Sequence, residues 1–390
     1  MMLKLAEYYN NIEEWYSYMP IEKWPPLQEL GVADFFYDFI DNKLSEEDLE
    51  RMSIQHKYDK VDIPAYHIAG WYDNFLQATL RNYTQLNEKT NGQRLIIGPW
   101  GHGVFSSTLG ERSFGIHASG DWIDYEKDLT SLHIRWFDAM LKEKVSSAAE
   151  EAPIKLFVMG TNVWRDEYEW PLARTNYTPY YFHSGGRANT CYGDGRLSVE
   201  PAGSEPYDTF VYDPSNPVPT NGGGTLFAGV NTMGPRDQRE IESREDVLVY
   251  TSEPLTEPLE VTGPIKVKLW AKTDAIDTDF TAKLVDVMPN GKAYNLTDGI
   301  VRATYSNEIK QEDAIKDTIN EYEIDLWATS NVFLPGHCIR VEISSSNFPR
   351  YDMNLNTGKT MLISKEMKKA KQTIYHQSEY PSHILLPVIK

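Results

Sequence analysis

The feature that most constrains the fold of this chain is a change of pattern near residue 150 of its 390 residues. Between residues 61 and 150, short apolar runs alternate with apolar residues at helical spacing. The runs at 63–70 and 94–97 predict buried strands, and the spacing over 75–86 and 122–140 predicts amphipathic helices. Strand, helix, strand, helix is the order that is typical of a parallel α/β sheet.

The rest of the chain has a different character on each side of this region. After a small, polar stretch at 145–152, strand-type runs separated by Gly-, Pro- and Asn-rich turns predict a β-sandwich or jelly roll. Before residue 61, Ser45 with three following acids indicates the start of a helix, and the segment is expected to be helical. We therefore expect a helical segment, an α/β segment and an all-β domain, at 1–60, 61–150 and 151–390. The strand-type runs lie at 154–159, 180–183, 247–251, 265–271, 280–287, 339–343 and 373–376.

Charge and cysteine content exclude several classes of protein. The net charge of −19 argues against a nucleic acid or an anionic membrane as partner, since either needs a basic face. No run of 18 apolar residues is present to span a bilayer, and the N-terminus lacks the apolar core of a signal peptide. Cys191 and Cys338 are too few for a disulfide framework and too far apart for a CxxC pair. These features predict a soluble, cytoplasmic protein that needs no metal or organic cofactor.

Two polar residues follow directly on the two predicted strands of the α/β region. Asp73 comes after the first strand and His102 after the second, with one helix between them. Functional side chains gather at the carboxyl ends of strands in open α/β sheets. A carboxylate can fix the tautomer of an imidazole that then takes a proton from a nucleophile. The order acid then His also matches the last two members of the α/β-hydrolase series Ser, Asp, His. Taken singly, however, Asp73 is more often a loop cap or a surface acid, and His102 is more often a structural histidine.

The sequence segments around these two residues resemble those of a known family. Residues 63–83 and 94–103 closely resemble the segments around the acid and the His of the cocaine-esterase / X-Pro dipeptidyl-peptidase (CocE/NonD) superfamily of serine hydrolases. The resemblance covers nearly the whole chain from about residue 60, and more loosely the start. Further matching segments lie at 135–144, 155–173, 212–224, 243–264, 277–291 and 344–358.

This resemblance implies a fold and a set of roles. The fold would be the C-terminal part of an α/β-hydrolase domain with a helical cap, followed by a jelly-roll (galactose-binding-like) domain. Asp73 would be the triad acid and His102 the triad base. Trp71, Phe75 and Phe227 would line the substrate pocket, with Phe227 approaching from the jelly roll beside Leu226.

The nucleophile of the family is not found in this sequence. It lies in a Gly-x-Ser-Tyr-x-Gly turn upstream of the acid, and none of Ser17, Ser45 and Ser53 stands in such a turn. Ser119, between Ala118 and Gly120, also lacks the strand–turn–helix context. We therefore expect the Ser, the oxyanion hole and the first strands of the sheet to belong to a missing N-terminal hydrolase segment. A sheet without those strands would expose apolar surface, so association, including homo-oligomers, is expected for the chain by itself.

The function that these observations predict is serine-dependent acyl hydrolysis of a small ester, amide or X-Pro peptide. A rival from another class is a non-catalytic jelly-roll module for ligand binding or assembly, in which Trp164, Trp170 and Trp270 stack on sugars. A binding module would have no reason to keep the Asp73 and His102 pair. An acidic cluster at 274–279 lacks the Gly and the distal Glu of a calcium loop, and His183, His337 and His376 are expected to be structural.

Overall fold

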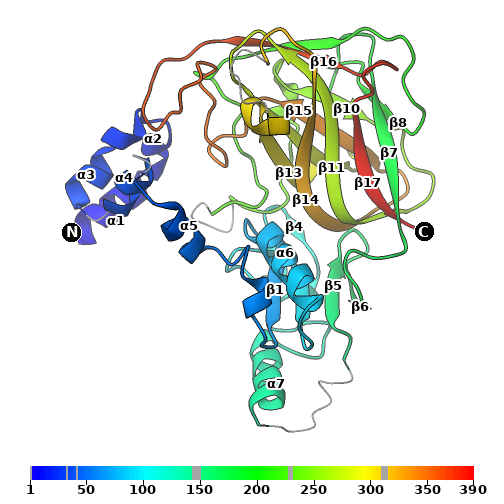
Figure 1. Cartoon of the computed structure of the whole chain (residues 1–390). Coiled ribbons are helices and arrows are strands. Elements are labelled where there is room, and N and C mark those ends of the chain that lie inside the picture. The colour runs from blue at the N-terminus through cyan, green and yellow to red at the C-terminus, as the bar shows by residue number, and fades with distance from the viewer. Residues whose placement is uncertain (1, 32–33, 41–42, 143–150, 227–231, 309–314) are drawn as a thin grey trace.

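The structure is a computed structural model that describes residues 2–31, 34–40, 43–142, 151–226, 232–308 and 315–390. Figure 1 shows a group of N-terminal helices, a small α/β unit and a large β-sandwich above it. The helices are α1 Met2–Asn10, α2 Ile12–Tyr16, α3 Pro25–Leu30, α4 Asp34–Ile40, α5 Glu46–Met52, α6 Leu76–Asn87 and α7 Leu129–Leu141. Short 3-10 helices lie at Ile21–Lys23, Tyr58–Lys60, Ile116–Ala118, Ile241–Ser243 and Ala303–Glu308.

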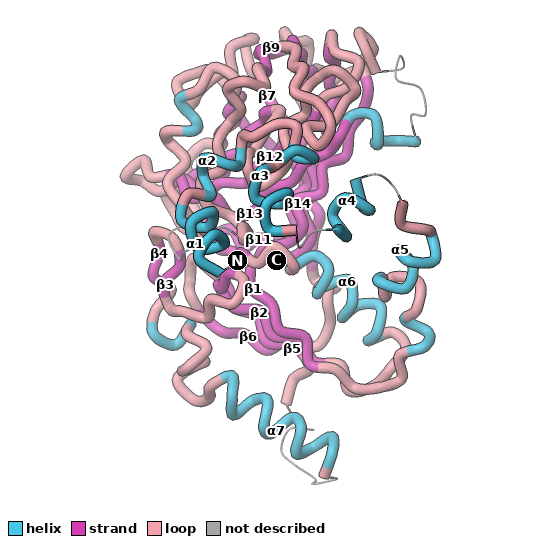
Figure 2. Tube along the Cα trace, turned by 90° about the vertical axis from the view of Figure 1, so that its left-hand side faces the viewer, coloured by secondary structure: helices cyan, strands magenta, loops and turns pink. Residues whose placement is uncertain are grey.

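The N-terminal segment is helical, as the sequence predicts. Helix α5 begins after Ser45, whose hydroxyl accepts a hydrogen bond from the Asp48 N–H, while the Asp48 carboxylate accepts one from the Ser45 N–H. The stretch around α3 is tied to the far end of the chain. The backbone N–H of Ile21 donates to the Met361 carbonyl over 3.1 Å, and Met19 and Ile21 pack on a buried cluster that includes Leu355. The first helices therefore lie beside the sandwich (Figure 2).

The small unit is a four-stranded sheet in the order β1-β2-β5-β6. Strands β1, β2 and β5 run parallel, and β6 is antiparallel to β5. Its strands are β1 Tyr66–Tyr72, β2 Arg94–Gly101, β5 Ile154–Val158 and β6 Val163–Glu167, and a separate two-stranded ribbon joins β3 Thr108–Leu109 to β4 Arg112–Ser113. Helix α6 covers β1 through Leu76, Leu80, Tyr83 and Leu86, which are buried along one of its faces. The predicted strand–helix–strand order is confirmed.

The predicted helix over 122–140 is too long at its start. Helix α7 begins only at Leu129, where the Asp128 carboxylate accepts a hydrogen bond from the Ser131 N–H. Trp122 and Tyr125 precede it in a turn, and Tyr125 has a positive φ of 62°. A side chain at positive φ interrupts a right-handed helix, and apolar spacing does not reveal that.

The two sheets do not divide at residue 150. Strands β5 and β6 belong to the small sheet, so the predicted boundary at 150/151 cuts that sheet, and the large sheet begins only at Thr175. The two sheets are also joined directly. The N–H of Met159 donates to the Ser330 carbonyl over 3.0 Å, and the N–H of Val332 donates to the Met159 carbonyl over 2.8 Å.

The large sheet contains 11 strands, almost all of them antiparallel. They are β7 Thr175–His183, β8 Arg196–Ser198, β9 Asp208–Tyr212, β10 Leu248–Thr251, β11 Leu259–Thr273, β12 Asp279–Val287, β13 Ala293–Arg302, β14 Asn320–Phe333, β15 Cys338–Ser344, β16 Ala370–Tyr375 and β17 His383–Ile389. The strand order is β13-β12-β15-β10-β8-β7-β17-β11-β16-β9, and β14 pairs with the other edge of β11. The strand-type runs of the sequence analysis lie on these strands, except the run at 154–159, which lies on β5 of the small sheet.

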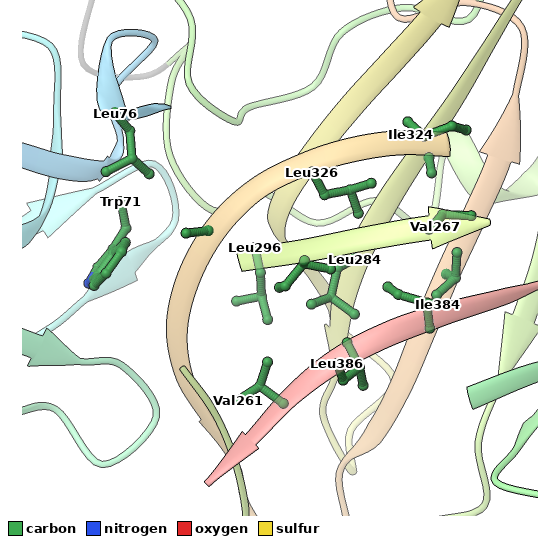
Figure 3. Close-up of a cluster of buried hydrophobic side chains, with 14 of the residues drawn as sticks. Trp71, Leu76, Val261, Val267, Leu284, Leu296, Ile324, Leu326, Ile384 and Leu386 are labelled. Carbon is green, nitrogen blue, oxygen red and sulfur yellow. The ribbon is translucent and has the colours of Figure 1, made fainter. Parts of the chain in front are cut away.

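The sheet folds over so that its two halves face each other across an apolar core. Figure 3 shows that β12 and β13 supply Leu284 and Leu296 from one side, while β11, β14 and β17 supply residues from the other. The latter are Val261, Val267, Ile324, Leu326, Ile384 and Leu386, all buried. This is a β-sandwich. No helix within the described residues is long and apolar enough to cross a membrane.

Candidate active site

Asp73 occupies a tight turn between β1 and α6. Its N–H donates to the Gly70 carbonyl over 3.0 Å, and its Oδ1 accepts a hydrogen bond of 2.8 Å from the Phe75 N–H. An aspartate that hydrogen-bonds the backbone two residues ahead is held by an Asx turn. The carboxylate therefore has a fixed direction at the end of the strand, and its side chain is only 14% exposed.

His102 meets this carboxylate from the neighbouring strand. Its Nδ1 lies 3.2 Å from Asp73 Oδ2 and 3.3 Å from Oδ1. The parallel pairing of β1 with β2 sets Gly70 against Gly98 and Tyr72 against Gly101, so the two strand ends present the acid and the His side by side. A carboxylate only accepts, so Nδ1 carries the proton and Nε2 is left as the basic nitrogen. The His102 side chain is 47% exposed, which makes the pair accessible.

Two glycines allow the strand ends to approach each other this closely. A Cβ added at Gly70 would lie 2.2 Å from the Trp100 carbonyl oxygen, and one at Gly98 would lie 2.3 Å from the Trp100 ring. Trp100 is fully buried, and its indole N–H donates to the Ala118 carbonyl over 2.7 Å. The glycines at the two strand ends thus reflect packing against one buried residue, Trp100, through its backbone at Gly70 and its ring at Gly98.

The residues that the sequence analysis assigned to a substrate pocket divide into three cases. Phe75 stands beside the pair: its ring centroid lies 5.0 Å from that of His102 in an edge-on arrangement, and it is 49% exposed. Trp71 does not. It is buried to 3% exposure, and its indole N–H donates to the Phe157 carbonyl over 2.7 Å, so it is a core residue with no face toward a substrate. Phe227 lies outside the described residues, next to the exposed Leu226.

The sequence predicted an approach of residues 226 and 227 from the jelly roll, but not that the glycines before them lie against the Asp73 turn. Residues 220–226 come from the β-sandwich side of the chain, yet Gly224 lies against the backbone of Tyr72 and Asp73. The Gly224 carbonyl accepts a hydrogen bond from Arg350. The run of three glycines at 222–224 is visible in the sequence, but a partner 126 residues away is not.

The other candidates have structural explanations. Trp164 and Trp170 are buried, at 9% and 8% exposure, so they offer no platform for stacking on a sugar. Trp270 is only partly buried, and its ring lies against that of Tyr380 with 5.3 Å between the centroids. The three histidines that were expected to be structural each pair with a carboxylate: His183 with Glu205, His337 with Asp286 and His376 with Asp208.

Hydrogen bonds within the protein also account for the acidic cluster at 274–279 and for Ser119. Asp277 and Asp279 accept hydrogen bonds from Asn354, and Asp279 pairs with Arg302. The described residues contain no group of three or more His, Cys, Asp or Glu side chains placed to hold a metal ion. The Ser119 hydroxyl accepts a hydrogen bond from the Asp121 N–H in a turn.

Comparison with known proteins places the chain in a family. Residues 19–104 match the X-Pro dipeptidyl-peptidase (S15) family, and residues 147–385 match the X-Pro dipeptidyl-peptidase C-terminal non-catalytic domain. The chain is 42% identical over 393 residues to the cocaine esterase of Rhodococcus sp. (strain MB1 Bresler), and the match covers 100% of the chain and 67% of the esterase. The chain belongs to the CocE/NonD family of serine hydrolases. The S15 match contains both Asp73 and His102.

Solved structures of similar proteins agree with this family membership. An α-amino acid ester hydrolase is 25% identical with a TM-score of 0.79, and the match covers 94% of the chain and 62% of that protein. An aminopeptidase from a Thaumarchaeota archaeon of marine sediment is 28% identical with a TM-score of 0.72, over 85% of the chain and 56% of that protein. The chain therefore spans between about half and two thirds of the length of these relatives.

Proposed function

We propose that this chain supplies the acid, the base and the β-sandwich of a serine ester hydrolase. The observation that carries the proposal is the contact between His102 Nδ1 and Asp73 Oδ2 at 3.2 Å, made at the ends of adjacent parallel strands. Two relatives whose names state an ester substrate, the cocaine esterase and the α-amino acid ester hydrolase, favour an ester over an X-Pro peptide. The fold that accompanies this proposal is the C-terminal part of an α/β-hydrolase domain joined to a jelly roll.

In the proposed mechanism each residue has one task. Asp73 holds the Nδ1–H tautomer and stabilises the imidazolium once it forms. His102 uses Nε2 to take the proton from a serine hydroxyl as that oxygen attacks the ester carbonyl, and then returns the proton to the leaving alcohol. Water attacks the acyl-enzyme in a second round with His102 again as base. Phe75, edge-on to His102, would form one wall of the acyl pocket.

The nucleophilic serine belongs, in this proposal, to a hydrolase segment that pairs with the chain. Strand β1 forms the edge of the small sheet and pairs only with β2 among the described strands, so its other edge is open to a further parallel strand. Helix α7, which lies at the end of the small sheet away from the sandwich in Figures 1 and 2, exposes Ile134, Phe137 and Leu141. A docked segment would cover these surfaces. Self-association of the chain is the alternative way to cover them, and sedimentation of the chain alone distinguishes a monomer from a homo-oligomer.

The experiment compares p-nitrophenyl ester hydrolysis by the 390-residue chain alone and by the chain completed with a serine-bearing segment. The chain alone should stay at background, because removing even one oxyanion donor costs about 10²–10³ in kcat and here the nucleophile is absent as well. In the completed protein, His102→Ala should abolish turnover, while His56→Ala, a change at an exposed histidine, should not. Hydrolysis by the chain alone that a serine-reactive phosphonate abolishes would refute the proposal.

A non-catalytic binding module is the second candidate function. The buried positions of Trp164 and Trp170 weigh against sugar stacking, and no observation of the described residues favours this function over hydrolysis.

A further inference from the structure

A buried guanidinium lies beneath the loop that touches the Asp73 turn. Arg350 makes an ion pair with Asp298 on β13, with 2.9 Å between Nε and Oδ1 and both side chains at most 6% exposed. The guanidinium also lies 5.2 Å from the centroid of the Trp327 ring, within the range of a cation–π contact. Tyr351 completes the group by donating its hydroxyl hydrogen to Asp298 over 3.2 Å. Because Asp298 and the Trp327 ring both contact the guanidinium, its position is fixed.

This cation holds the glycine loop by its backbone. Arg350 Nη1 donates to the Gly224 carbonyl, and the Arg350 N–H donates to the Thr220 hydroxyl over 3.0 Å. One residue therefore contacts the loop at its start and at its last glycine. Asp298 fills the space beneath Gly223: a Cβ added at Gly223 would lie 2.8 Å from its carboxylate.

Gly224 connects Arg350 to the backbone of the catalytic acid, Asp73. A Cβ added at Gly224 would lie 3.0 Å from Arg350 Nη1, 3.3 Å from the Asp73 carbonyl carbon and 3.3 Å from the Tyr72 carbonyl oxygen. The Cβ position of Gly224 thus faces both the guanidinium and the backbone of Tyr72 and Asp73, so the loop backbone lies close to both. Tyr72 is itself held, because its hydroxyl donates to the Asn295 carbonyl of β13 over 3.2 Å.

A second connection reaches the first turn of α6, which follows Asp73 in the chain. The N–H of Trp327, the ring under Arg350, donates to Asp325 Oδ1 over 2.7 Å. Asp325 Oδ2 accepts a hydrogen bond of 2.5 Å from Gln77 in the first turn of α6, four residues after Asp73. The sandwich therefore holds the chain on both sides of the acid.

We propose that Arg350 is a positioning residue for catalysis. By fixing Gly224 against the Tyr72–Asp73 peptide, it keeps the Asp73 carboxylate at Nδ1 of His102 and so selects the productive tautomer. This inference rests on the proposed function for its catalytic meaning, although the positioning itself can be measured without catalysis. It gives the sandwich half of the chain, which matches a domain described as non-catalytic, a direct part in the alignment of the acid and the base.

The first test reads the His102 ring directly in the 390-residue chain. Proton–nitrogen correlation spectra of the imidazole, assigned by comparison with His102→Ala, report which ring nitrogen carries the proton. Two variants perturb the support. Gly224→Ala adds a methyl group at a position where the backbone is not left-handed, so only the contacts above are affected. Arg350→Lys keeps a cation beside Asp298, so that the fold is retained, but one ammonium group lacks the planar fork that serves Asp298 and Gly224 together.

The matched control is Gly203→Ala, since a Cβ at Gly203 has no atom within 4 Å and its φ is also not left-handed. In the wild type and in Gly203→Ala, the neutral ring should hold its proton on Nδ1. In Gly224→Ala and Arg350→Lys, a measurable share of the molecules should carry the ring proton on Nε2. The melting temperature of both variants should stay close to that of the wild type. Folded variants with the wild-type ring spectrum would overturn the proposal.

The second test measures hydrolysis in the completed enzyme. Misplacing a catalytic group by about 1 Å costs up to about 10²-fold, so we expect kcat to fall by about tenfold or more in both variants, with KM within about twofold of the wild type. If the completed protein hydrolyses no ester while the ring spectra respond, the proposed function fails and the positioning role stands. If hydrolysis proceeds and both variants equal the wild type in rate and spectra, the positioning role is wrong.

Discussion

The buried carboxyl of Glu242 makes the stability of the sandwich depend on pH. Glu242 lies in the 3-10 helix Ile241–Ser243 at 0% exposure, and its Oε2 accepts a hydrogen bond of 2.6 Å from Arg340 Nη1. Next to it on the sandwich strands, Glu342 accepts a hydrogen bond of 2.9 Å from Lys283, which also donates to Gln238. Within the described part of the chain, Oε1 of each of the two glutamates has no hydrogen-bond partner. Burial and the nearby Glu342 carboxylate raise the pKa of Glu242 to about 8, against the opposing effect of Arg340 and Lys283.

The magnitude follows from linkage between proton binding and folding. One pKa unit is worth about 1.36 kcal/mol, so a rise from the ordinary 4.5 to about 8 corresponds to at most about 5 kcal/mol. The unfolded chain releases this proton near pH 4.5, whereas the folded chain keeps it to about pH 8. In that window the folded state binds more protons than the unfolded state. The free energy of unfolding therefore falls as the pH rises, by up to about 1.4 kcal/mol per pH unit, and levels off above pH 8.

The assay is urea unfolding at pH values from 5 to 9 for the wild type, Glu242→Gln and the control Glu240→Gln. Glutamine imitates the neutral carboxyl, so the stability of Glu242→Gln relative to the wild type should rise by about 3–4 kcal/mol between pH 5 and pH 8. Glu240 is an exposed neighbour, and its replacement should leave the pH dependence of the wild type unchanged. Parallel pH profiles for Glu242→Gln and the wild type, or a difference that grows in favour of the wild type, would refute the reasoning.

Three further predictions concern the strand ends and their support. In the completed enzyme, Asp73→Asn should lower kcat for ester hydrolysis by up to about 10⁴-fold while the melting temperature stays within a few degrees, because the amide favours the wrong tautomer of the imidazole. Gly70→Ala should lower the unfolding free energy by about 1–3 kcal/mol in a denaturant titration, since the new Cβ meets the Trp100 carbonyl oxygen at 2.2 Å. Trp71→Phe should cost about 1–3 kcal/mol in the same titration, because the buried Phe157 carbonyl loses its donor.

Local patterns in the sequence predicted most of what is local in the structure. The alternation around 63–97 located β1, α6 and β2, and the strand ends then predicted the approach of Asp73 and His102. This works because parallel neighbours place their carboxyl ends at one edge. The same reasoning failed at Trp122, where apolar spacing continued through a turn at positive φ.

What the sequence did not predict depends on contacts between distant segments. Trp71 is aromatic and precedes Asp73 by two residues in the sequence, but the end of β1 is buried on both faces and its indole packs in the core against Phe157. The partnership of Gly224 with Arg350 joins two loops that no periodicity relates. The division between the sheets was placed at a polar stretch, although pairing with β2 keeps β5 and β6 in the small sheet.

That pairing has a consequence for anyone who recombines members of this family. A chimera joined at residue 150 would take β5 and β6 from one parent and β1 and β2 from the other, so the crossover would pass through the middle of a parallel sheet. A crossover between Glu167 and Thr175 leaves that sheet with one parent. Even there, the backbone hydrogen bonds that join Met159 to Ser330 and Val332 must form between a small sheet from one parent and a sandwich from the other. Those bonds use only the main chain and place few demands on side-chain identity, so an exchange of whole sandwiches depends mainly on keeping side-chain contacts such as Gln77 with Asp325 across the same boundary.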